Sequence, residues 1–439
     1  MTVTSAPADD EQSISISPQA RTALWASLVG TTIEWYDFFL YATAASLVFN
    51  KAFFPDQTTF VGTMLSFATF AVGFLVRPIG GFVFGHVGDR IGRKRTLAFT
   101  MFLMGGATAL MGVLPTAAQI GVLAPILLLL LRIVQGFALG GEWAGAVLLA
   151  VEHGPPRRRG LFGSIPQIGL AIGLALGTGV FALLQVVLPD DAFLAYGWRI
   201  AFLFSIVLVI FGVVVRLRAS ETPAFEKVRD SDDRAAVPLK DVFRPPALRS
   251  TVLGMLSRWG EGAAFNTWGV FAIAYATSTL KLDKIPVLVA VTVAALLMAG
   301  LIPVSGLLSD RFGPKRVYAI GIAAYGVAVF PVFALFDTKN IWLYAVAMVV
   351  VFGIIHALFY GAQGTLYASL YPARIRYTGL STVYQLSGVY SSGLTPLILT
   401  ALIGAAGGTP WIACGYLVVT AVISVVATLL LKPTPLTGI

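Results

Sequence analysis

Long apolar runs separated by short charged loops dominate this sequence. Many of them reach the ~20 residues that a helix needs to cross the ~30 Å hydrocarbon layer of a bilayer. They are continuous and lack the ~10-residue alternating pattern of a membrane β-barrel. With 57% hydrophobic and 12% charged residues, the composition also lies outside the range of soluble proteins. The sequence therefore predicts an all-α membrane protein.

Turn residues and charges divide these runs into twelve predicted transmembrane helices. The spans cover residues 21–49, 58–87, 96–114, 119–152, 161–187, 199–217, 249–279, 286–309, 316–335, 340–370, 378–404 and 410–431. We expect the following division: a disordered N-terminus (1–20), a first six-helix half (21–217), a charged cytoplasmic linker (218–248), a second half (249–431) and a tail (432–439). No apolar signal-peptide segment precedes the first span, and the single Cys414 excludes an internal disulfide.

Positive charges predict the orientation, because Lys and Arg concentrate on cytoplasmic loops. With the N-terminus inside, one face carries most of the basic loop residues, and the other carries only Lys51, Lys281, Lys284, Lys339 and Arg199. Both termini are then cytoplasmic, in a plasma membrane of bacterial type. The net charge of +9 is explained by this topology, so we expect the lipid bilayer as partner and no nucleic acid.

Two loops repeat each other. GHVGDRIGRKR (85–95) follows the second span, and GLLSDRFGPKR (306–316) follows the eighth. A second echo joins RRRGLFGS to RYTGLS, before the fifth and eleventh spans. The two halves are therefore parallel duplicates, a pattern found in secondary transporters whose site lies between the halves.

These loops and the twelve spans resemble the major facilitator superfamily. Within it, four stretches are similar to the metabolite:proton symporters: EWYDFFLYATAA, FLVRPIGGFVFGHVGDRIGRKR, RIVQGFALGGEWAGA and YPARIRYTGLSTVYQ. Two more, LYATAASLVFNKAFFP and YGWRIAFLFSIVLVI, resemble their shikimate-transporter branch. The resemblance implies the major facilitator fold, alternating access, no cofactor or metal, and a monomer.

Charged side chains inside the spans are the first functional candidates, because each costs roughly 2.5–3.5 kcal/mol at a helix centre. There are four acids and three arginines: Glu34, Asp37, Glu142, Glu261, Arg77, Arg132 and Arg258. The surplus carboxyl group suits proton coupling. Asp37 is the preferred proton carrier, able to share its proton with Glu34 one turn away, and Glu142 competes with it. Alternatively, one of these acids only pairs with an arginine.

The arginines predict a site for a carboxylate, which a guanidinium binds through two charge-assisted hydrogen bonds. Each of the three could instead form a structural ion pair, and Arg258 and Glu261, three residues apart, could neutralise each other. The resemblance adds a set of polar residues as candidate substrate contacts, especially those in the first, seventh and tenth spans. They are Tyr36, Asn266, Tyr360, Gln363, Tyr384 and Gln385, with Trp143 and Trp268 as further cavity candidates. We expect His356 to be structural.

The repeated loops predict a cytoplasmic gate. In the resembled superfamily the loop acid latches the two halves together. Here these acids are Asp89 and Asp310, with less support for their basic neighbours Arg90, Arg93, Arg95, Arg311 and Arg316. The alternative is that these charges only determine topology.

Together these features predict a proton-coupled symporter that imports a small organic acid: shikimate-like, a dicarboxylate or an aromatic carboxylate. A zwitterion such as proline or betaine is the main alternative substrate. A uniporter, an antiporter or a non-transporting sensor would use the same fold. No nucleophile elbow, phosphate-binding loop or His/Cys cluster supports an enzyme.

Overall fold

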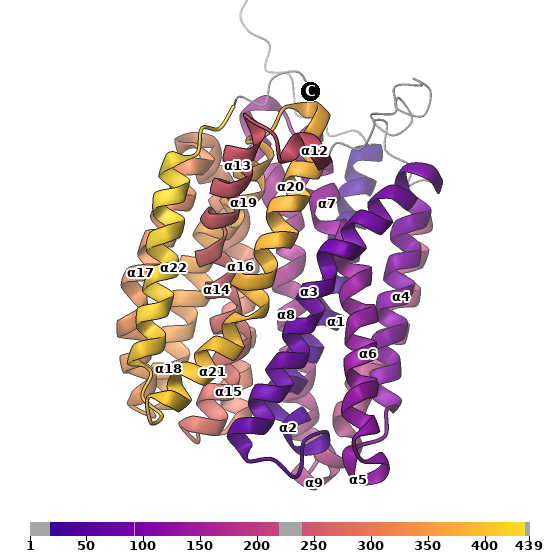
Figure 1. Cartoon of the computed structure of the whole chain (residues 1–439), viewed down its shortest axis with the longest axis vertical. Helices are drawn as coiled ribbons and strands as arrows, with labels where there is room; N and C mark the ends of the chain where they lie inside the picture. The colour runs from indigo at the N-terminus through magenta and orange to yellow at the C-terminus, as the bar shows by residue number, and fades with distance from the viewer. Residues whose placement is uncertain (1–17, 92, 219–238, 435–439) are drawn as a thin grey trace, which may run out of the picture.

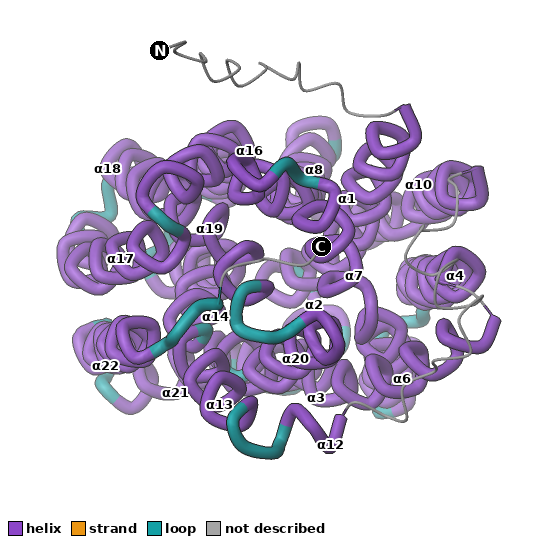
Figure 2. Tube along the Cα trace, turned by 90° about the horizontal axis from the view of Figure 1, so that it is seen from above, coloured by secondary structure: helices purple, strands orange, loops and turns teal. Residues whose placement is uncertain are grey.

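The protein is a bundle of long helices (Figure 1). The computed structural model describes residues 18–91, 93–218 and 239–434, and every regular element in these ranges is helical (Figure 2).

The first part of the chain contains α1 (Pro18–Leu47), α2 (Phe49–Ala52), α3 (Thr59–Ile91), α4 (Arg93–Val113), α5 (Ala117–Ile120), α6 (Leu123–Ala138), η1 (Leu139–Gly141), α7 (Glu142–His153), η2 (Pro156–Arg158), α8 (Arg159–Val187), α9 (Asp190–Ala192), η3 (Phe193–Gly197) and α10 (Trp198–Arg218).

The second part contains α12 (Leu239–Val242), α13 (Ala247–Ser257), α14 (Trp259–Asn266), η4 (Thr267–Phe271), α15 (Ala272–Ala274), η5 (Tyr275–Thr279), α16 (Lys284–Phe312), α17 (Pro314–Asp337), α18 (Ile341–Met348), η6 (Val349–His356), α19 (Ala357–Ala368), α20 (Ala373–Gly388), η7 (Val389–Gly393), α21 (Thr395–Ala405) and α22 (Trp411–Leu430).

Nine helices among the described residues are long and apolar enough to cross a membrane. They coincide with nine of the predicted spans. The first, third and seventh predicted spans fall on α1, on α4 and on the stretch from α13 to η5. The first span contains Glu34 and Asp37, the helix of the seventh is divided at Arg258, and the apolar part of α4 is short, Ala98–Val113. The count of twelve therefore stays a prediction at these three positions.

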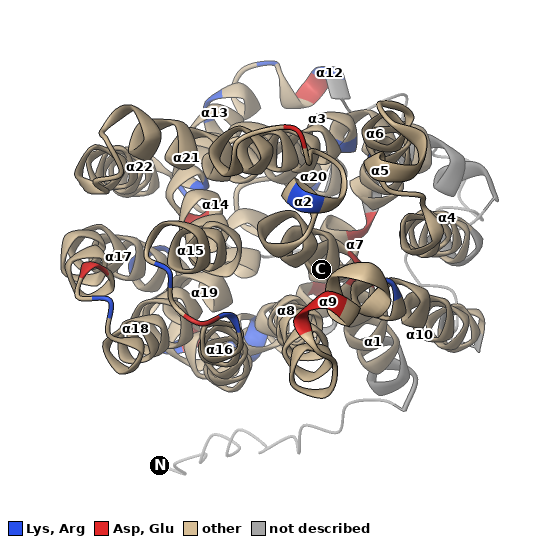
Figure 3. Cartoon of the chain, turned by 90° about the horizontal axis from the view of Figure 1, so that it is seen from below, with Lys and Arg blue, Asp and Glu red and all other residues tan. Residues whose placement is uncertain are grey.

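The outer surface of the bundle is apolar. Large hydrophobic side chains such as Val327, Phe102 and Ile210 are 79%, 66% and 61% exposed. Seen end-on in Figure 3, most of the helical ribbon is made of residues other than Lys, Arg, Asp and Glu. Such a surface suits lipid, and the helices satisfy their backbone groups internally, as a bilayer requires.

The two parts of the chain lie side by side, with α1 to α10 on one side and α13 to α22 on the other (Figure 1). The helices α8 and α16 pack along each other between them. Small residues allow this contact: a Cβ atom on Gly160 would lie 2.5 Å from the carbonyl oxygen of Gly306. Further along, the hydroxyl groups of Thr178 and Thr292 are 2.7 Å apart. The proposed linker falls largely on 219–238, outside the described residues, so the domain boundaries remain predictions.

Candidate functional site

A cavity lies between the two parts of the chain, with an empty volume of about 270 Å³. Most of this space is too narrow for a molecule, because the part that a water-sized group can occupy is about 10 Å³. Small-molecule sites typically have about 300–1,000 Å³, so a metabolite can bind only after the neighbouring helices separate. The lining residues come from α1, α3, α8, α14, α20 and η7 and from the junction before α14: Trp35, Phe38, Phe39, Phe74, Arg77, Leu170, Arg258, Glu261, Phe265, Asn266, Tyr384 and Ser392.

Five of the predicted substrate contacts are thus brought together in one lining: Arg77, Arg258, Glu261, Asn266 and Tyr384. The remaining five lie outside it: Arg132, Tyr36, Tyr360, Gln363 and Gln385. The structure assigns positions to these residues, and their roles in binding remain predictions.

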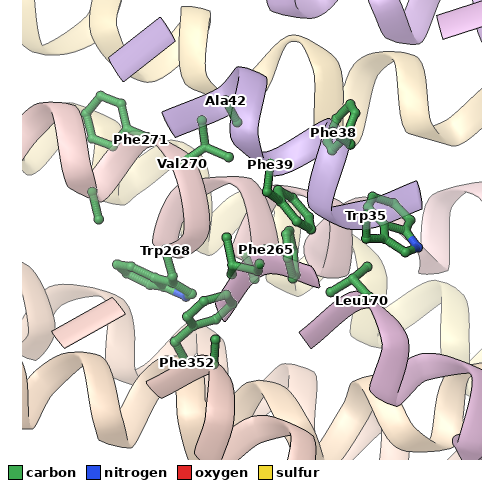
Figure 4. Packing of buried hydrophobic residues seen from close by; sticks show 14 of the residues in the cluster. Trp35, Phe38, Phe39, Ala42, Leu170, Phe265, Trp268, Val270, Phe271 and Phe352 are labelled. Atoms are coloured by element: carbon green, nitrogen blue, oxygen red, sulfur yellow. The ribbon is translucent and has the colours of Figure 1, made fainter. Parts of the chain in front are cut away.

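Aromatic rings form one wall of the cavity, which the sequence analysis missed. The ring of Trp35 stacks on that of Phe39 with 5.3 Å between centroids. Phe39 approaches Phe265 of the other half at 5.2 Å (Figure 4), and Phe38 meets Phe74 at 5.3 Å. The spacing of Trp35, Phe38 and Phe39 along one face of α1 was a signal for this wall, because residues three and four apart share a helix face.

Arg77 has unused hydrogen-bond donors. Its guanidinium carbon lies 4.2 Å from the ring centre of Phe74 and 4.5 Å from that of Phe38, contacts that hold a cation against aromatic faces. Its Nε and Nη2 atoms are buried and have no hydrogen-bond partner among the described residues. Glu34 of α1 acts on it electrostatically. This arrangement can accept a carboxylate from the cavity.

Arg258 is bound differently, at the junction of α13 and α14. Its Nε atom lies 3.2 Å from Oε2 of Glu261, the pairing that their spacing predicted as one alternative. Its Nη1 donates to the carbonyl oxygen of Tyr384 at 3.3 Å and to Ser387 Oγ at 3.2 Å. The Tyr384 ring lies 3.8 Å from the guanidinium carbon. The charge of Arg258 is therefore balanced within the protein.

Arg132 is fully buried away from the cavity. Its Nη1 donates to Oε1 of Gln135, and its guanidinium lies over the rings of Tyr41 and Phe38. Gln135 in turn donates to Thr108 Oγ1 at 2.9 Å and to the carbonyl oxygen of Asp37 at 3.3 Å. Arg132 thus connects to the α1 backbone through Gln135.

Asp37 is enclosed within the first half. Its side chain is 0% exposed and lies beside Thr108 of α4 and Ser205 of α10. Neither carboxyl oxygen forms a well-aligned hydrogen bond within the described residues, although these two hydroxyl groups are close enough to act on it. The neighbouring Tyr36 turns the same way and donates to the carbonyl oxygen of Ala201 at 2.9 Å. Glu34 and Asp37 therefore face different surroundings, and a proton shared between them stays a prediction.

Glu142 lies near α4 rather than in the cavity lining. Its Oε1 accepts a hydrogen bond of 2.6 Å from Thr100. The next residue, Trp143, donates to Gln167 Oε1 at 2.7 Å, and its ring stacks on Tyr384 at 3.8 Å. Gln385 donates to the carbonyl oxygen of Gly140 at 2.5 Å. The Trp143–Tyr384 and Gln385–Gly140 contacts join the two parts of the chain beside the cavity.

Several buried polar groups of the second half have no partner among the described residues. They are Asn266 Oδ1, both ring nitrogens of His356, the Tyr360 hydroxyl and both amide atoms of Gln363. His356 and Tyr360 lie one helical turn apart, with ring centroids at 5.5 Å, and Phe265 packs against His356 at 5.3 Å. Native proteins leave few such groups unpaired, so this region can hold a polar ligand. Trp268 packs against apolar neighbours, including Phe333, and its Nε1 is likewise buried without a partner among the described residues.

At the predicted cytoplasmic end, Asp310 of α16 caps α8. Its Oδ1 accepts from the Gly160 N–H at 2.6 Å and its Oδ2 from the Leu161 N–H at 3.0 Å. A carboxylate there interacts favourably with the positive end of the helix dipole. Arg376 Nη1 and Glu152 Oε1 lie 3.7 Å apart. Arg311 and Arg316 are exposed, and the side chains of Asp89, Arg90, Arg93 and Arg95 lie outside the described set.

Two family models match the chain. The model described as sugar (and other) transporter covers residues 22–255, and the major facilitator superfamily model covers 261–438.

Curated relatives are similar over almost the whole chain. A shikimate transporter of Escherichia coli K12 is 39% identical, covering 96% of this chain and 97% of the relative. An inner membrane metabolite transport protein of the same organism, YhjE, is 39% identical over 91% of each chain. A proline/betaine transporter of Salmonella typhimurium is 34% identical, covering 95% and 85%.

A solved structure shares the fold. The xylose transporter XylE of E. coli, in a partially occluded inward-open conformation, aligns with a TM-score of 0.74 at 16% identity, covering 96% of this chain and 100% of that chain.

Proposed function

This chain belongs to the major facilitator superfamily of membrane transporters, and from this premise we propose that it imports a small organic acid together with a proton by alternating access. It is a multi-pass membrane transporter and not an enzyme. The proposed location is the bacterial inner membrane, with both termini in the cytoplasm.

The buried carboxyl group of Asp37 is the observation that carries the proposal. An ionised carboxylate without a partner is strongly unfavourable in an apolar interior. Neither carboxyl oxygen of Asp37 forms a well-aligned hydrogen bond among the described residues, and only neutral hydroxyl groups, of Ser205 and Thr108, act on it. We therefore infer that Asp37 holds the coupled proton in this conformation. Its helix, α1, also supplies Trp35, Phe38 and Phe39 to the cavity, so a proton on Asp37 and a substrate in the cavity act on the same element.

Arg77 is the proposed binding group for the substrate carboxylate. It lines the cavity, and its Nε and Nη2 atoms are unused. Glu34 already acts on it electrostatically, so an entering carboxylate competes with Glu34 for the same cation. Protonation of Glu34 would weaken this competition, which offers a direct link between proton and substrate.

The transport cycle we propose has three steps. A proton reaches Asp37, and the substrate carboxylate binds Arg77, while the outer side is open. The halves then close around the substrate, as in the narrow cavity seen here. The Asp310 latch on α8 then breaks, and the cytoplasmic side opens. A carboxylate–helix contact that breaks and reforms is a two-state element of the kind that alternating access needs.

Uptake by proteoliposomes tests the proposal. A panel of shikimate, 2-oxoglutarate, citrate, benzoate and proline is offered with and without an acidic exterior. We expect an acidic exterior to drive accumulation of at least one acid by the wild type. Asp37→Asn should keep counterflow of that acid but lose the pH-driven accumulation. Asp56→Asn, in an exposed loop, is the matched control and should behave as wild type.

Other outcomes identify the alternatives. Uptake by the wild type that does not depend on the pH difference would indicate a uniporter or an antiporter. Accumulation of proline alone would favour the zwitterion, a substrate class named for the Salmonella relative. Undiminished pH-driven accumulation by Asp37→Asn would remove Asp37 from the coupling mechanism.

A further inference from the structure

We propose that a second site, at the predicted outer end of the first half, binds the carboxylate of the transported acid before the acid enters the central cavity. This inference rests on the proposed function and adds a capture site to it. It follows from a pocket of suitable size, from two cations that line this pocket, and from the lack of an acidic residue in the same lining.

The outer pocket lies at the end of the bundle that carries α2, α5 and α9 (Figure 1). Its empty volume is about 730 Å³, of which a water-sized group can occupy about 330 Å³. Both values fall in the range of about 300–1,000 Å³ typical of small-molecule sites. A small organic acid therefore fits here while the central cavity is closed. The lining residues come from the turn between α1 and α2, from α5 with its cap, from η3 and from α10: Val48, Lys51, Ala52, Thr116, Ala118, Gln119, Leu194, Ala195 and Arg199.

Close packing holds the walls of the outer pocket together. The buried ring of Trp198 meets Phe49 of α2 edge-on, with 6.0 Å between ring centroids, and Phe202 of α10 at 5.7 Å. Gly112 lets α4 approach α10, since a Cβ atom there would lie 2.8 Å from Phe202 Cβ. These contacts join α2 and α4 to α10. The fold therefore forms the pocket without a ligand.

Two cations line the outer pocket. Arg199 is fixed in place, because its Nη1 donates to the carbonyl oxygens of Gly112 at 3.0 Å and Leu114 at 2.6 Å. Its guanidinium carbon also lies 4.4 Å from the ring centre of Trp198. These partners are neutral, so the positive charge remains available to an anion. The ammonium group of Lys51 has no ion-pair or hydrogen-bond partner among the described residues.

The acids at the same end of the bundle do not neutralise these two cations. Asp190 lies 3.6 Å from Lys284 of the second part of the chain. Asp56 and Asp191 are exposed. None of these three acids lines the outer pocket, so its lining is positive overall.

A carboxylate suits this lining. Gln119 adds a neutral donor, because its Oε1 accepts from the Thr116 N–H at 3.0 Å and its Nε2 can only donate. A carboxylate accepts hydrogen bonds from guanidinium, ammonium and amide groups alike. Membrane topology disfavours basic residues on an outer face, so two of them in one pocket need a further explanation. The proposed substrate is an anion that arrives from this side, and a positive pocket raises its local concentration.

Thiol labelling of Ala118→Cys in a Cys414→Ser background tests this inference, because residue 118 is exposed and lines the outer pocket. The protein is held in phosphatidylcholine nanodiscs, and a maleimide is added with shikimate, benzoate or 2-oxoglutarate. We expect at least one acid to slow labelling about threefold or more, as occupancy predicts once its concentration exceeds about twice its Kd. Thr338→Cys, exposed on the same predicted face and outside the pocket, should be labelled at an unchanged rate.

Variants separate the outer pocket from the central cavity. Lys51→Gln should abolish the slowing, whereas Arg77→Lys, in the central cavity, should retain it. For the same acid, Lys51→Gln should also raise the apparent KM of uptake by roughly threefold to tenfold at unchanged kcat, because the local concentration of the anion falls. This difference should disappear at about 1 M salt, where the Debye length is about 3 Å. Lys339→Gln, at an exposed lysine outside the pocket, is the matched control and should keep the wild-type values.

The outcomes distinguish this inference from the proposed function. Labelling that no acid slows, or slowing that Lys51→Gln retains, would overturn the outer site and leave the proton symport standing. Slowing by inorganic phosphate alone, or by adding phosphatidylglycerol to the nanodiscs without any acid, would also overturn it, because the pocket would then bind a different anion or a lipid headgroup. Slowing by an acid that the wild type does not transport under any pH difference would support a carboxylate site and contradict the proposed function.

Discussion

The three buried arginines carry the same charged group but have different partners. Arg258 is paired with Glu261, Arg132 is held by Gln135 between aromatic rings, and Arg77 keeps unpaired donors at the cavity. The residues next to them in the sequence do not show which of the three arginines binds substrate. The Nε atom of each arginine lacks a hydrogen bond among the described residues, but only Arg77 also leaves Nη2 unpaired. Arg77 also lines the cavity, whereas Arg132 does not and Arg258 has Glu261 as its counter-charge.

Arg77→Lys should raise the apparent KM for the transported acid with little change in kcat. Lysine keeps the charge but cannot present two donors in a fixed plane, and losing one charge-assisted hydrogen bond of about 1.5–3 kcal/mol weakens binding by about tenfold or more. Initial uptake rates across substrate concentrations measure the effect. Arg249→Lys, at an exposed arginine of α13 that does not line the cavity, is the control. An unchanged KM in Arg77→Lys would contradict the assignment.

Glu261→Gln should destabilise the protein, whereas Asp37→Asn should not. The first leaves the buried guanidinium of Arg258 without its counter-charge, a loss of about 3–5 kcal/mol for buried pairs. The second replaces a carboxyl group that has no partner with a neutral amide of similar size. Thermal unfolding of the purified proteins in detergent compares them. Equal losses of Tm in both variants would show that Asp37 has a partner after all.

At the scale of elements, α8 and α16 form the central contact between the two parts of the chain. Asp310 of α16 binds the first N–H groups of α8, and Thr178 meets Thr292 further along. Alternating access requires these two helices to separate at one end at a time. Variants at these two contacts therefore test opposite ends of the interface between α8 and α16.

Asp310→Asn should favour opening on the cytoplasmic side. The amide keeps one acceptor but loses the charge that interacts with the α8 dipole, worth about 1 kcal/mol, which shifts the gate equilibrium by roughly fivefold. Ser164→Cys in a Cys414→Ser background reports opening. Residue 164 is buried just inside the gate, so its thiol is labelled faster when the cytoplasmic side opens. Asp190→Asn, at an exposed ion pair on the other face, is the control. Labelling no faster than in the control would argue against a latch.

Thr178→Cys combined with Thr292→Cys should form a disulfide that blocks transport. The two hydroxyl oxygens lie 2.7 Å apart, so the two side chains point at each other, and a small movement of the helices can bring the Cβ atoms to the about 3.5–4.5 Å that a disulfide needs. Oxidation should stop uptake, and a reductant should restore it. Each single variant, with Cys414 buried, should be insensitive to both treatments. Normal uptake by the oxidised, cross-linked protein would contradict movement at this contact.

At the scale of the whole molecule, two sets of helices meet through many non-covalent contacts. Besides α8 and α16, Trp143 stacks on Tyr384, and Phe39 packs on Phe265. If the halves are the separate units that the repeat predicts, the linker is needed only as a tether.

Co-expressed fragments 1–228 and 229–439 should assemble and transport. The break lies within 219–238, and the apolar contacts between α8 and α16 hold the halves together. Co-purification through a tag on one fragment, followed by uptake in proteoliposomes, measures this. Each fragment alone should not transport, because the cavity takes residues from both. Fragments that never co-purify would contradict the division into two halves.

Much of this molecule follows from its sequence. The apolar runs predicted the helices, and the repeated loops and the quoted motifs predicted the family, which the comparisons confirm. These features are local: a run of apolar residues must become a helix in a bilayer wherever it lies in the bundle.

The tertiary structure decided the site. It separated Arg77 from Arg132 and Arg258, placed Asp37 inside the first half, turned Tyr36 towards α10 and added the aromatic wall of Trp35, Phe39 and Phe265. The physical reason is that the free energy of a buried charge or polar group depends on the groups that surround it. Those surroundings come from helices far apart in the chain, so only their packing determines which groups remain free to bind.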